Sequence, residues 1–256
     1  MTFEIVTDPL FWALAVPAVV LNGISKGGLG GAAGSVSTPL MALAVPPAQA
    51  AAILLPVLCV MDLAGIKAYL GKWERRLIFQ VMLPAGLLGG LIGTLTFRVM
   101  KDDWIRLLLG AIAIGFLAWN LVPKKSSDRR PSDAEGWLWC GLSGFTSFVT
   151  HVGSPPLLVW ILPQKLEKAV FVSTLLVFFA AMNWFKIPAY LWLGLLDLRN
   201  LWTSVLLVPL GVAGTYLGVW LQTRIDVGVF YRIVYALLLV TGAKLLYDGV
   251  AGLWMS

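Results

Sequence analysis

The sequence predicts an all-α integral membrane protein, and three observations support this prediction. The chain of 256 residues is 59% hydrophobic and 12% charged, whereas a soluble domain has about 25% charged residues. Apolar runs of membrane-spanning length follow one another from end to end, where a β-barrel would show short alternating segments. Two of these runs are interrupted by glycine and proline at corresponding places in the two halves. We therefore expect about eight transmembrane helices in two four-segment repeats, with the first segment of each repeat broken at a Gly/Pro-rich motif.

The first segment, from about Pro9 to Val45, is broken by the stretch Asn22–Pro39, which holds six glycines and Lys26. An interior glycine costs a helix about 1 kcal/mol relative to alanine. Unwound backbone at membrane depth occurs where protein or a watery cavity satisfies its amides. A helix that resumes after the break offers free N–H groups and a positive dipole end. We interpret the stretch as half of a site for a small anion, with these charged and hydroxyl donors: Ser25, Lys26, Ser35, Ser37 and Thr38.

Three unbroken segments complete each half, and a polar connector joins the halves. We expect a first repeat over residues 1–122, a cytoplasmic connector over 123–136 and a second repeat over 137–256. Within the second repeat the first segment is broken near His151–Pro156. The connector is assigned to the cytoplasm because it and the loop after the second segment are rich in lysine and arginine.

The two halves resemble each other residue by residue. Proline, glycine, lysine and arginine recur at an offset that grows from 117, for Pro39 and Pro156, to 126, for Arg106 and Arg232. Such a repeat with interrupted helices is typical of secondary transporters. The basic residues of the second half leave one question open. The broken segments either cross the membrane, giving parallel repeats, or fold back as re-entrant hairpins, giving inverted ones.

Ionisable residues at membrane depth cost about 2.5–3.5 kcal/mol each on insertion scales and by default indicate function. Besides Lys26 they include Asp62 and His151, and both are candidates for coupling a proton to transport. Asp62 is also a candidate counter-charge to Lys26 or Lys67, or a hydrogen-bonding partner between helices. His151 could bind an anion, or it could be structural. Other lysines lie nearer segment ends, where we expect the side chain to extend to the membrane interface: Lys67, Lys186 and Lys244.

Further hydrogen-bond donors surround the second break. Thr150 and Ser154 flank His151, and Asn183 in the sixth segment could donate to an oxyanion, although a bond between helices is the commoner use of such a residue. A sulfonate, sulfite or carboxylate needs several donors and few acceptors. The first break is longer and holds Lys26, so we expect the two halves of the site to differ in role.

Two sequence motifs resemble the sulfite exporter TauE/SafE family, an anion and organosulfonate permease family. The first is GISKGGLGG followed by STPLMAL and PPAQAAAILLPVL, and the second is GFTSFVTHVGSPPLLVWIL. The resemblance covers both halves and implies a multi-pass carrier in the bacterial inner (plasma) membrane for sulfite, organosulfonates or similar small organic anions. Ser154 stands where the family usually has glycine, and Lys26 resembles a subgroup. By motif match the resemblance assigns to the site Gly27, Gly28, Gly30, Pro39, His151, Gly153, Pro155 and Pro156.

Together these features predict a secondary transporter that exports a small anion such as sulfite or sulfoacetate. The alternatives are a proton-coupled uptake permease and an anion channel. We expect no enzyme activity, catalytic residue or cofactor, because one histidine and one deep aspartate do not form a nucleophile with its base. Cys59 and Cys140 stand without a CxxC or Cys/His cluster, so we expect no metal. The expected partners are the anionic substrate and the lipid bilayer, without nucleic acid, and a homodimer is left open.

Overall fold

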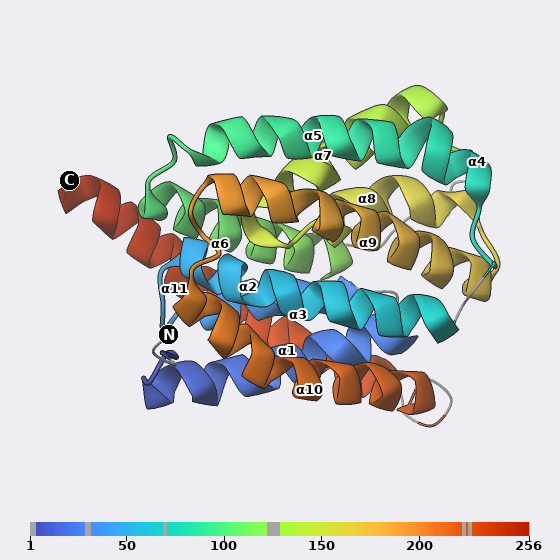
Figure 1. Cartoon of the computed structure of the whole chain (residues 1–256). Coiled ribbons are helices and arrows are strands. Elements are labelled where there is room, and N and C mark those ends of the chain that lie inside the picture. Colours follow the sequence, from blue (N-terminus) through green and yellow to red (C-terminus); the bar gives the residue numbers. More distant parts are fainter. Residues whose placement is uncertain are drawn as a thin grey trace.

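The structure is a bundle of long helices that lie roughly along one direction (Figure 1). The computed structural model describes residues 4–28, 32–68, 71–121, 129–221, 224 and 227–255. Every regular element in these ranges is helical, and seven of the helices there are long and apolar enough to cross a membrane. The prediction of an all-helical membrane protein is thus confirmed. The α-helices are α1 (Pro9–Gly28), α2 (Ser37–Met41), α3 (Pro47–Ala68), α4 (Arg75–Leu77), α5 (Leu83–Phe97), α6 (Asp102–Leu121), α7 (Asp133–Thr150), α8 (Ser154–Ile161), α9 (Lys168–Trp192), α10 (Leu198–Leu221) and α11 (Val227–Met255).

Both predicted helix breaks are present. After α1 ends at Gly28, helical structure resumes in the 3-10 turn η1 (Ala32–Val36) and continues into α2. In the second half α7 ends at Thr150, and His151 adopts a left-handed conformation with φ of 57° before α8 begins at Ser154. Gly30 and residues 123–128 of the predicted connector lie outside the described residues.

The first broken segment folds back on itself. Gly34 N donates to Ser25 Oγ over 3.2 Å, and Asn22 Nδ2 donates to Gly34 O over 3.3 Å. Further along the chain, Ser37 Oγ donates to Ala18 O over 2.9 Å. Residue numbers rise after the break while their partners' numbers fall, so η1 and α2 run back along α1. We call this element, residues 9–41, the first hairpin.

The second broken segment reverses in the same way. Ser143 Oγ donates to the carbonyl of Gly153 over 2.7 Å, and Trp160 Nε1 donates to the carbonyl of Ser132 over 2.9 Å. We call residues 133–161 the second hairpin. Since both segments fold back, α3 begins at the end of the molecule where both chain termini lie, and α9 begins at the opposite end (Figure 1). Inverted repeats require that α3 and α9 begin at opposite ends in this way. That the two halves are repeats of each other stays a prediction.

Each hairpin packs along a helix of the other half. The first helix of the first hairpin, α1, lies against α10, and α7 lies against α5. Glycines make both contacts close: a Cβ on Gly23 would meet Gly211 O at 2.5 Å, and a Cβ on Gly144 would meet Gly86 Cα at 2.8 Å. Small residues let the backbones of membrane helices approach in this way. Part of the glycine content that marks the breaks therefore serves helix packing.

The two ends of the bundle differ in charge. Interactions between halves tie together the loops at the end opposite the termini: Glu74 N donates to Thr174 Oγ1 over 3.0 Å, and Arg76 pairs with Asp133 over 2.7 Å. Basic residues outnumber acidic ones at this end, where Glu74, Asp133, Glu135 and Glu167 lie among Lys72, Arg75, Arg76, Arg129, Arg130, Lys165, Lys168, Arg224 and Arg232. At the other end, basic residues are mixed with acidic ones: Asp8, Arg98, Lys101, Asp102, Asp103, Arg106, Asp197 and Arg199.

Candidate functional site

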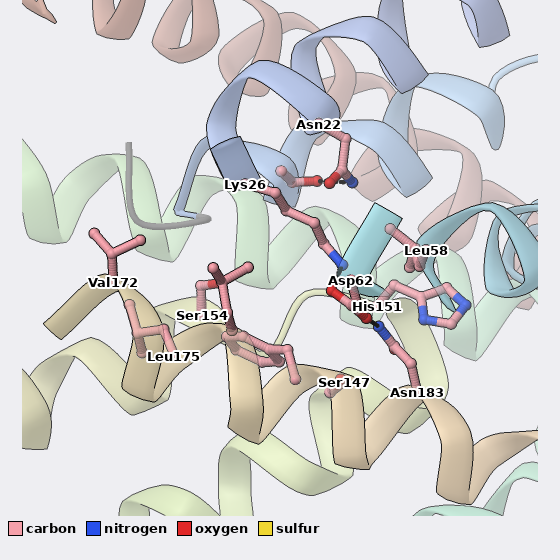
Figure 2. Close-up of a pocket in the computed structure, with 13 residues that line it drawn as sticks. Asn22, Lys26, Leu58, Asp62, Ser147, His151, Ser154, Val172, Leu175 and Asn183 are labelled. Carbon is pink, nitrogen blue, oxygen red and sulfur yellow. Dashed lines mark hydrogen bonds and ion pairs between the residues drawn. The ribbon is translucent and has the colours of Figure 1, made fainter. Parts of the chain in front are cut away.

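A small cavity lies where the two hairpins meet α3 and α9 (Figure 2). The space open to the centre of a water molecule is about 40 Å³, and one water needs about 10–15 Å³ on that measure. The cavity thus has room for a few waters or one small anion. Residues of both hairpins, α3 and α9 line it: Asn22, Lys26, Gly34, Leu58, Asp62, Ser147, His151, Ser154, Val172, Leu175, Leu176, Phe179 and Asn183.

Lys26 and Asp62 form a buried ion pair across the cavity wall. Lys26 Nζ, on α1, contacts Asp62 Oδ1, on α3. Lys26 is 9% exposed and Asp62 is fully buried, so neither side chain extends to a membrane interface. An ammonium has three N–H donors, and within the described ranges Asp62 is the partner recorded for Lys26. Two donors of Lys26 are therefore available to an occupant of the cavity.

Asn183 links this pair to a second lysine. Its Nδ2 donates to Asp62 Oδ2 over 2.7 Å, and its Oδ1 accepts from Lys186 Nζ over 3.0 Å. A carboxylate only accepts and an ammonium only donates, so the two partners fix the amide orientation. Asn183 therefore connects helices through hydrogen bonds, and it also lines the cavity.

The expectation that Lys186 extends to the membrane interface is wrong. Its side chain is fully buried, and its Nζ lies within hydrogen-bond distance of Ser147 Oγ at 2.9 Å and His151 Nδ1 at 3.0 Å, in addition to Asn183. Polar partners from the second hairpin and from its own helix α9 satisfy the hydrogen-bonding capacity of the nitrogen, so the side chain does not need to extend to water. Lys186 lies directly behind three residues of the cavity wall.

Protein groups occupy both ring nitrogens of His151. Nε2 lies 2.8 Å from the carbonyl oxygen of Ala51, which can only accept, so Nε2 carries a hydrogen. Nδ1 faces Lys186 and accepts from it. From its place in the break we expected His151 either to bind the anion or a proton or to be structural. Its geometry makes it a bridge between the second hairpin, α3 and α9, and its left-handed backbone turns the chain toward α8.

Asn22 was not among the predicted site residues, although it lines the cavity one helical turn before Lys26. Its Nδ2 donates to Gly34 O and, over 3.0 Å, to Ser37 Oγ. Ser37 in turn donates to Ala18 O, so it must accept from Asn22, which fixes the orientation of the amide. Asn22 Oδ1 is left buried and without a hydrogen-bond partner in the described part of the chain.

The predicted site residues that the structure describes fall into three groups. Lys26, Asp62, His151, Ser154 and Asn183 line the cavity. A second group holds the hairpins together: Ser25 and Ser37 through the hydrogen bonds given above, and Thr150, whose Oγ1 donates to Thr146 O over 2.7 Å and accepts from Val152 N over 3.2 Å. The remainder are packed in or beside the hairpins away from the lining: Gly27, Gly28, Ser35, Thr38, Pro39, Gly153, Pro155 and Pro156.

The half-helices offer fewer free N–H groups than the sequence led us to expect. Proline has no N–H, and Pro155 and Pro156 take two of the first three positions of α8. In the first hairpin α2 has five residues, too few for a strong dipole. Side chains, above all Lys26 and Ser147, are therefore the main donors at the cavity.

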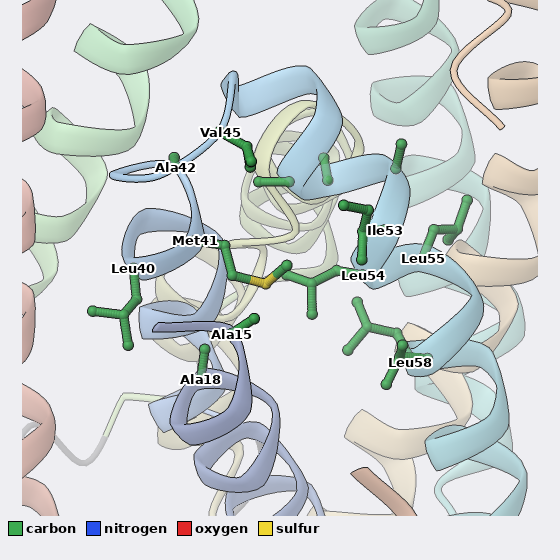
Figure 3. Close-up of a cluster of buried hydrophobic side chains, with 14 of the residues drawn as sticks. Ala15, Ala18, Leu40, Met41, Ala42, Val45, Ile53, Leu54, Leu55 and Leu58 are labelled. Atoms are coloured by element: carbon green, nitrogen blue, oxygen red, sulfur yellow. The ribbon is translucent and has the colours of Figure 1, made fainter. Parts of the chain in front are cut away.

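A hydrophobic cluster supports the cavity on the side of the chain termini (Figure 3). Met41 of the first hairpin packs there with Ala15 and Ala18 of α1 and with Ile53 and Leu54 of α3, and all five are fully buried. This packing fixes α1 relative to α3, so that Lys26 and Asp62 can meet.

The sequence contained signals for several residues that we did not select. Lys186 follows Asn183 by three positions, so a helix places both on one face. Ser147 precedes His151 by four positions, about one helical turn. The apolar lining residues Leu175 and Phe179 gave no comparable signal, because they look like ordinary membrane-helix residues. In the described ranges, no group of three or more His, Cys, Asp or Glu side chains could hold a metal ion.

These features define a class of protein. A polytopic helical membrane protein with two re-entrant hairpins whose breaks meet at a charged cavity has the architecture of a secondary transporter. The family model described as "Sulfite exporter TauE/SafE" matches residues 15–245, and the chain belongs to this family. The family comprises transporters rather than enzymes, so membership implies a multi-pass membrane transporter of sulfite or organosulfonate-type anions. No curated protein and no solved structure was found to match the chain.

Proposed function

We propose that the chain is a carrier that exports a small anion, such as sulfite or a C2 organosulfonate like sulfoacetate, through the cavity between the two hairpins. One observation supports this proposal above the others. Two buried lysines belong to one hydrogen-bonded cluster with a single carboxylate, that of Asp62, which Lys26 contacts directly and Lys186 reaches through Asn183. With both lysines protonated, the cluster carries one positive charge in excess. An unpaired charge buried in a membrane protein costs several kcal/mol, and a monovalent anion in the cavity would remove that cost.

The walls of the cavity suit a small anion with an apolar part. Lys26, Ser147 and Ser154 supply polar groups, while Leu175 and Phe179 of α9 supply an apolar surface. A sulfonate with a short carbon chain presents both chemistries. The volume of about 40 Å³ argues against a larger occupant in this state of the protein.

The charge of the loops supports an orientation. Cytoplasmic loops of membrane proteins are enriched in lysine and arginine, so the basic end opposite the termini would face the cytoplasm. The family relation supports the plasma membrane of a bacterium as the location. An interior-negative potential favours the exit of an unaccompanied anion by about 2.3 kcal/mol per charge per 100 mV. The alternative is proton-coupled uptake, in which the proton compensates the charge of the anion.

Ligand-dependent thermal stability tests the proposal. We expect the Tm of the purified protein to rise with sulfite or with one of the organosulfonates sulfoacetate, taurine and isethionate, and to respond less to acetate and sulfate. Lys26→Met should reduce the affinity about 10- to 100-fold, because it removes a charge-assisted hydrogen bond worth about 1.5–3 kcal/mol. Lys67→Met is the matched control, since Lys67 is exposed. The proposal would be contradicted if none of these anions raised the Tm of the wild-type protein. It would also be contradicted if Lys26→Met and Lys67→Met bound the anion with the same affinity.

A flux measurement separates a carrier from a channel. In proteoliposomes a carrier that binds one anion per cycle should saturate as the anion concentration rises. A flux that grows in proportion to concentration far above the measured Kd would favour an anion channel instead.

A further inference from the structure

We propose that Lys186 is a proton-binding site of the transporter and that Ser147 couples this proton to the anion, so that one proton accompanies each monovalent anion. The inference rests on the proposed function, because it concerns the same cavity. It assigns the proton to a residue that does not itself line the cavity, in place of Asp62 or His151.

The partners of Lys186 accommodate both of its protonation states. As an ammonium it donates to all three neighbours: Ser147 Oγ, His151 Nδ1 and Asn183 Oδ1. As an amine it has two N–H groups and one lone pair, and it can donate to His151 and Asn183 while it accepts from the Ser147 hydroxyl. Only Ser147 can reverse its role, because Asn183 Nδ2 is engaged by Asp62 and the hydrogen of His151 is on Nε2. The amine state thus leaves neither Lys186 Nζ nor the atoms of its three neighbours that face it unpaired.

Ser147 lines the cavity, and the direction of its hydroxyl hydrogen depends on the protonation state of Lys186. When Lys186 is an ammonium, Ser147 accepts from it, and no group in the described ranges receives the hydroxyl hydrogen. That hydrogen can then donate to an anion. When Lys186 is an amine, the hydroxyl hydrogen points to Lys186, and a lone pair of Ser147 faces the cavity. Anion binding and protonation of Lys186 therefore favour each other.

The balance of buried charge also indicates that one proton on Lys186 accompanies one bound monovalent anion. The ionisable groups around Lys186 are His151 from the second hairpin, Asp62 and Cys59 from α3, and Lys26 from α1. With Lys186 as an amine and the other groups in their ordinary forms, Lys26 and Asp62 cancel and the empty cavity is neutral. With Lys186 protonated and a monovalent anion bound, the loaded cavity is neutral as well. A proton that passes from Lys186 to His151 stays within the cluster and does not alter this count.

Neutrality in both states has a consequence for transport. Moving a net charge through low-dielectric surroundings is costly, so the empty and the loaded carrier reorient most easily when both are neutral. The membrane potential then does not act on the transported pair. The direction of transport follows the concentration gradients of anion and proton together, and both export and uptake are compatible with this cycle.

Proton uptake on anion binding tests the inference in the wild-type protein. A pH-indicator dye in lightly buffered detergent solution reports the protons taken up when isethionate is added; its sulfonate keeps a fixed charge across the range from about pH 5.5 to 9.5. We expect up to one proton per bound anion at some pH in this range, with the affinity improving as pH falls there. Binding without proton uptake at every pH would overturn the inference and leave the proposed function intact, whereas absence of binding would count against both.

Variants separate the charge of Lys186 from its titration. Lys186→Met should lose proton uptake and bind isethionate about 10-fold or more weakly. Lys186→Arg keeps the charge but cannot release its proton, so it should bind without proton uptake. Ser147→Ala should lower the number of protons taken up per anion. The matched control is Thr146→Val, since the Thr146 hydroxyl donates to the backbone carbonyls of Leu142 and Ser143. Wild-type proton uptake in Lys186→Met would assign the proton to another group.

Transport in proteoliposomes provides a second readout. An imposed potential of 100 mV would redistribute an unaccompanied monovalent anion about 40-fold at equilibrium. We expect isethionate distribution in the wild type to be unchanged by a potassium–valinomycin potential and to shift when a pH difference is imposed. Redistribution by the potential alone would overturn one-to-one coupling.

Discussion

At the scale of single residues, Lys26 has two tasks that mutation can separate. It neutralises the buried carboxylate of Asp62, and its remaining donors face the cavity. Removing one partner of a buried ion pair costs about 3–5 kcal/mol, whereas replacing both can be nearly neutral. A loss of anion binding in Lys26→Met alone could therefore reflect a damaged fold.

The double variant Lys26→Met/Asp62→Asn resolves this ambiguity. We expect it to recover most of the thermal stability that Lys26→Met loses, because no buried charge remains unpaired at that place. It should still bind isethionate about 10- to 100-fold more weakly than the wild type. Tm without ligand and Kd by calorimetry check the two parts, and full recovery of affinity would show that Lys26 serves the fold alone.

Asn22 predicts a preference among organosulfonates. Its Oδ1 is a buried acceptor without a partner in the described residues, and leaving such a group unpaired costs about 1–3 kcal/mol. An anion that also carries a hydroxyl can satisfy it. We therefore expect isethionate to bind more tightly than propane-1-sulfonate, in which a methyl group replaces the hydroxyl, by roughly 5- to 50-fold. Equal affinities would show that the ligand does not reach Asn22.

A pair of variants ties this preference to Asn22. Asn22→Leu should remove it. Ser37→Ala loses the hydrogen bond from Asn22 Nδ2 but keeps Asn22 Oδ1, so it should retain the preference even if its stability falls.

The sequence allowed the charged residues of the site to be found, but not all the bonds among them. Lys26 and Asp62 are conspicuous because a charge inside an apolar run is costly. Lys186 was misjudged because its position, six residues before the end of α9, also suits a side chain that reaches the interface. Only the fold places Ser147 and His151, 39 and 35 positions away in the chain, beside its nitrogen.

At the scale of elements, glycine has a different role at each position. Gly27 lies in α1 where it faces α10, and a Cβ there would meet Thr215 O and, at 3.0 Å, Val219 N, which are backbone atoms. Gly115 lies in the middle of α6 with nothing within 4 Å of an added Cβ. The same substitution should therefore have opposite effects in the two helices.

We expect Gly27→Ala to destabilise the protein by about 1–3 kcal/mol, because α1 and α10 must move apart. Gly115→Ala should be neutral or stabilise it by up to about 1 kcal/mol, because alanine is the better helix former. Thermal unfolding of both variants in the same detergent checks this pair. A Gly27→Ala protein as stable as Gly115→Ala would mean that the two helices are not in close contact.

The glycine and proline content predicted where the first and fifth segments break, but it did not predict that they fold back. A break is a local property, since it follows from helix propensity. The reversal depends on which partner each side chain finds, as with Asn22 and Gly34 or Trp160 and Ser132. The amino-acid composition of a segment does not predict these hydrogen-bonded pairs.

At the scale of the whole molecule, the reversal of the hairpins explains a charge pattern that was ambiguous along the sequence. If the second broken segment crossed the membrane, residues before and after it, such as Arg130 and Lys165, would lie on opposite sides. Because it folds back, both lie at the end opposite the termini, where the basic residues gather. The fold and the enrichment of lysine and arginine in cytoplasmic loops then agree for both halves.

Cysteine labelling in bacterial cells tests this topology. In a background where the buried Cys59 and Cys140 are replaced by alanine, single cysteines are placed at four exposed positions: Asp8, Arg130, Lys165 and Asp197. If the basic end faces the cytoplasm as we propose, a membrane-impermeant maleimide should label the Asp8→Cys and Asp197→Cys proteins in intact cells. It should label the Arg130→Cys and Lys165→Cys proteins only after the membrane is opened. The reverse pattern would invert the orientation but keep the hairpins. Labelling of Arg130→Cys and Lys165→Cys from opposite sides would mean that the second broken segment crosses the membrane.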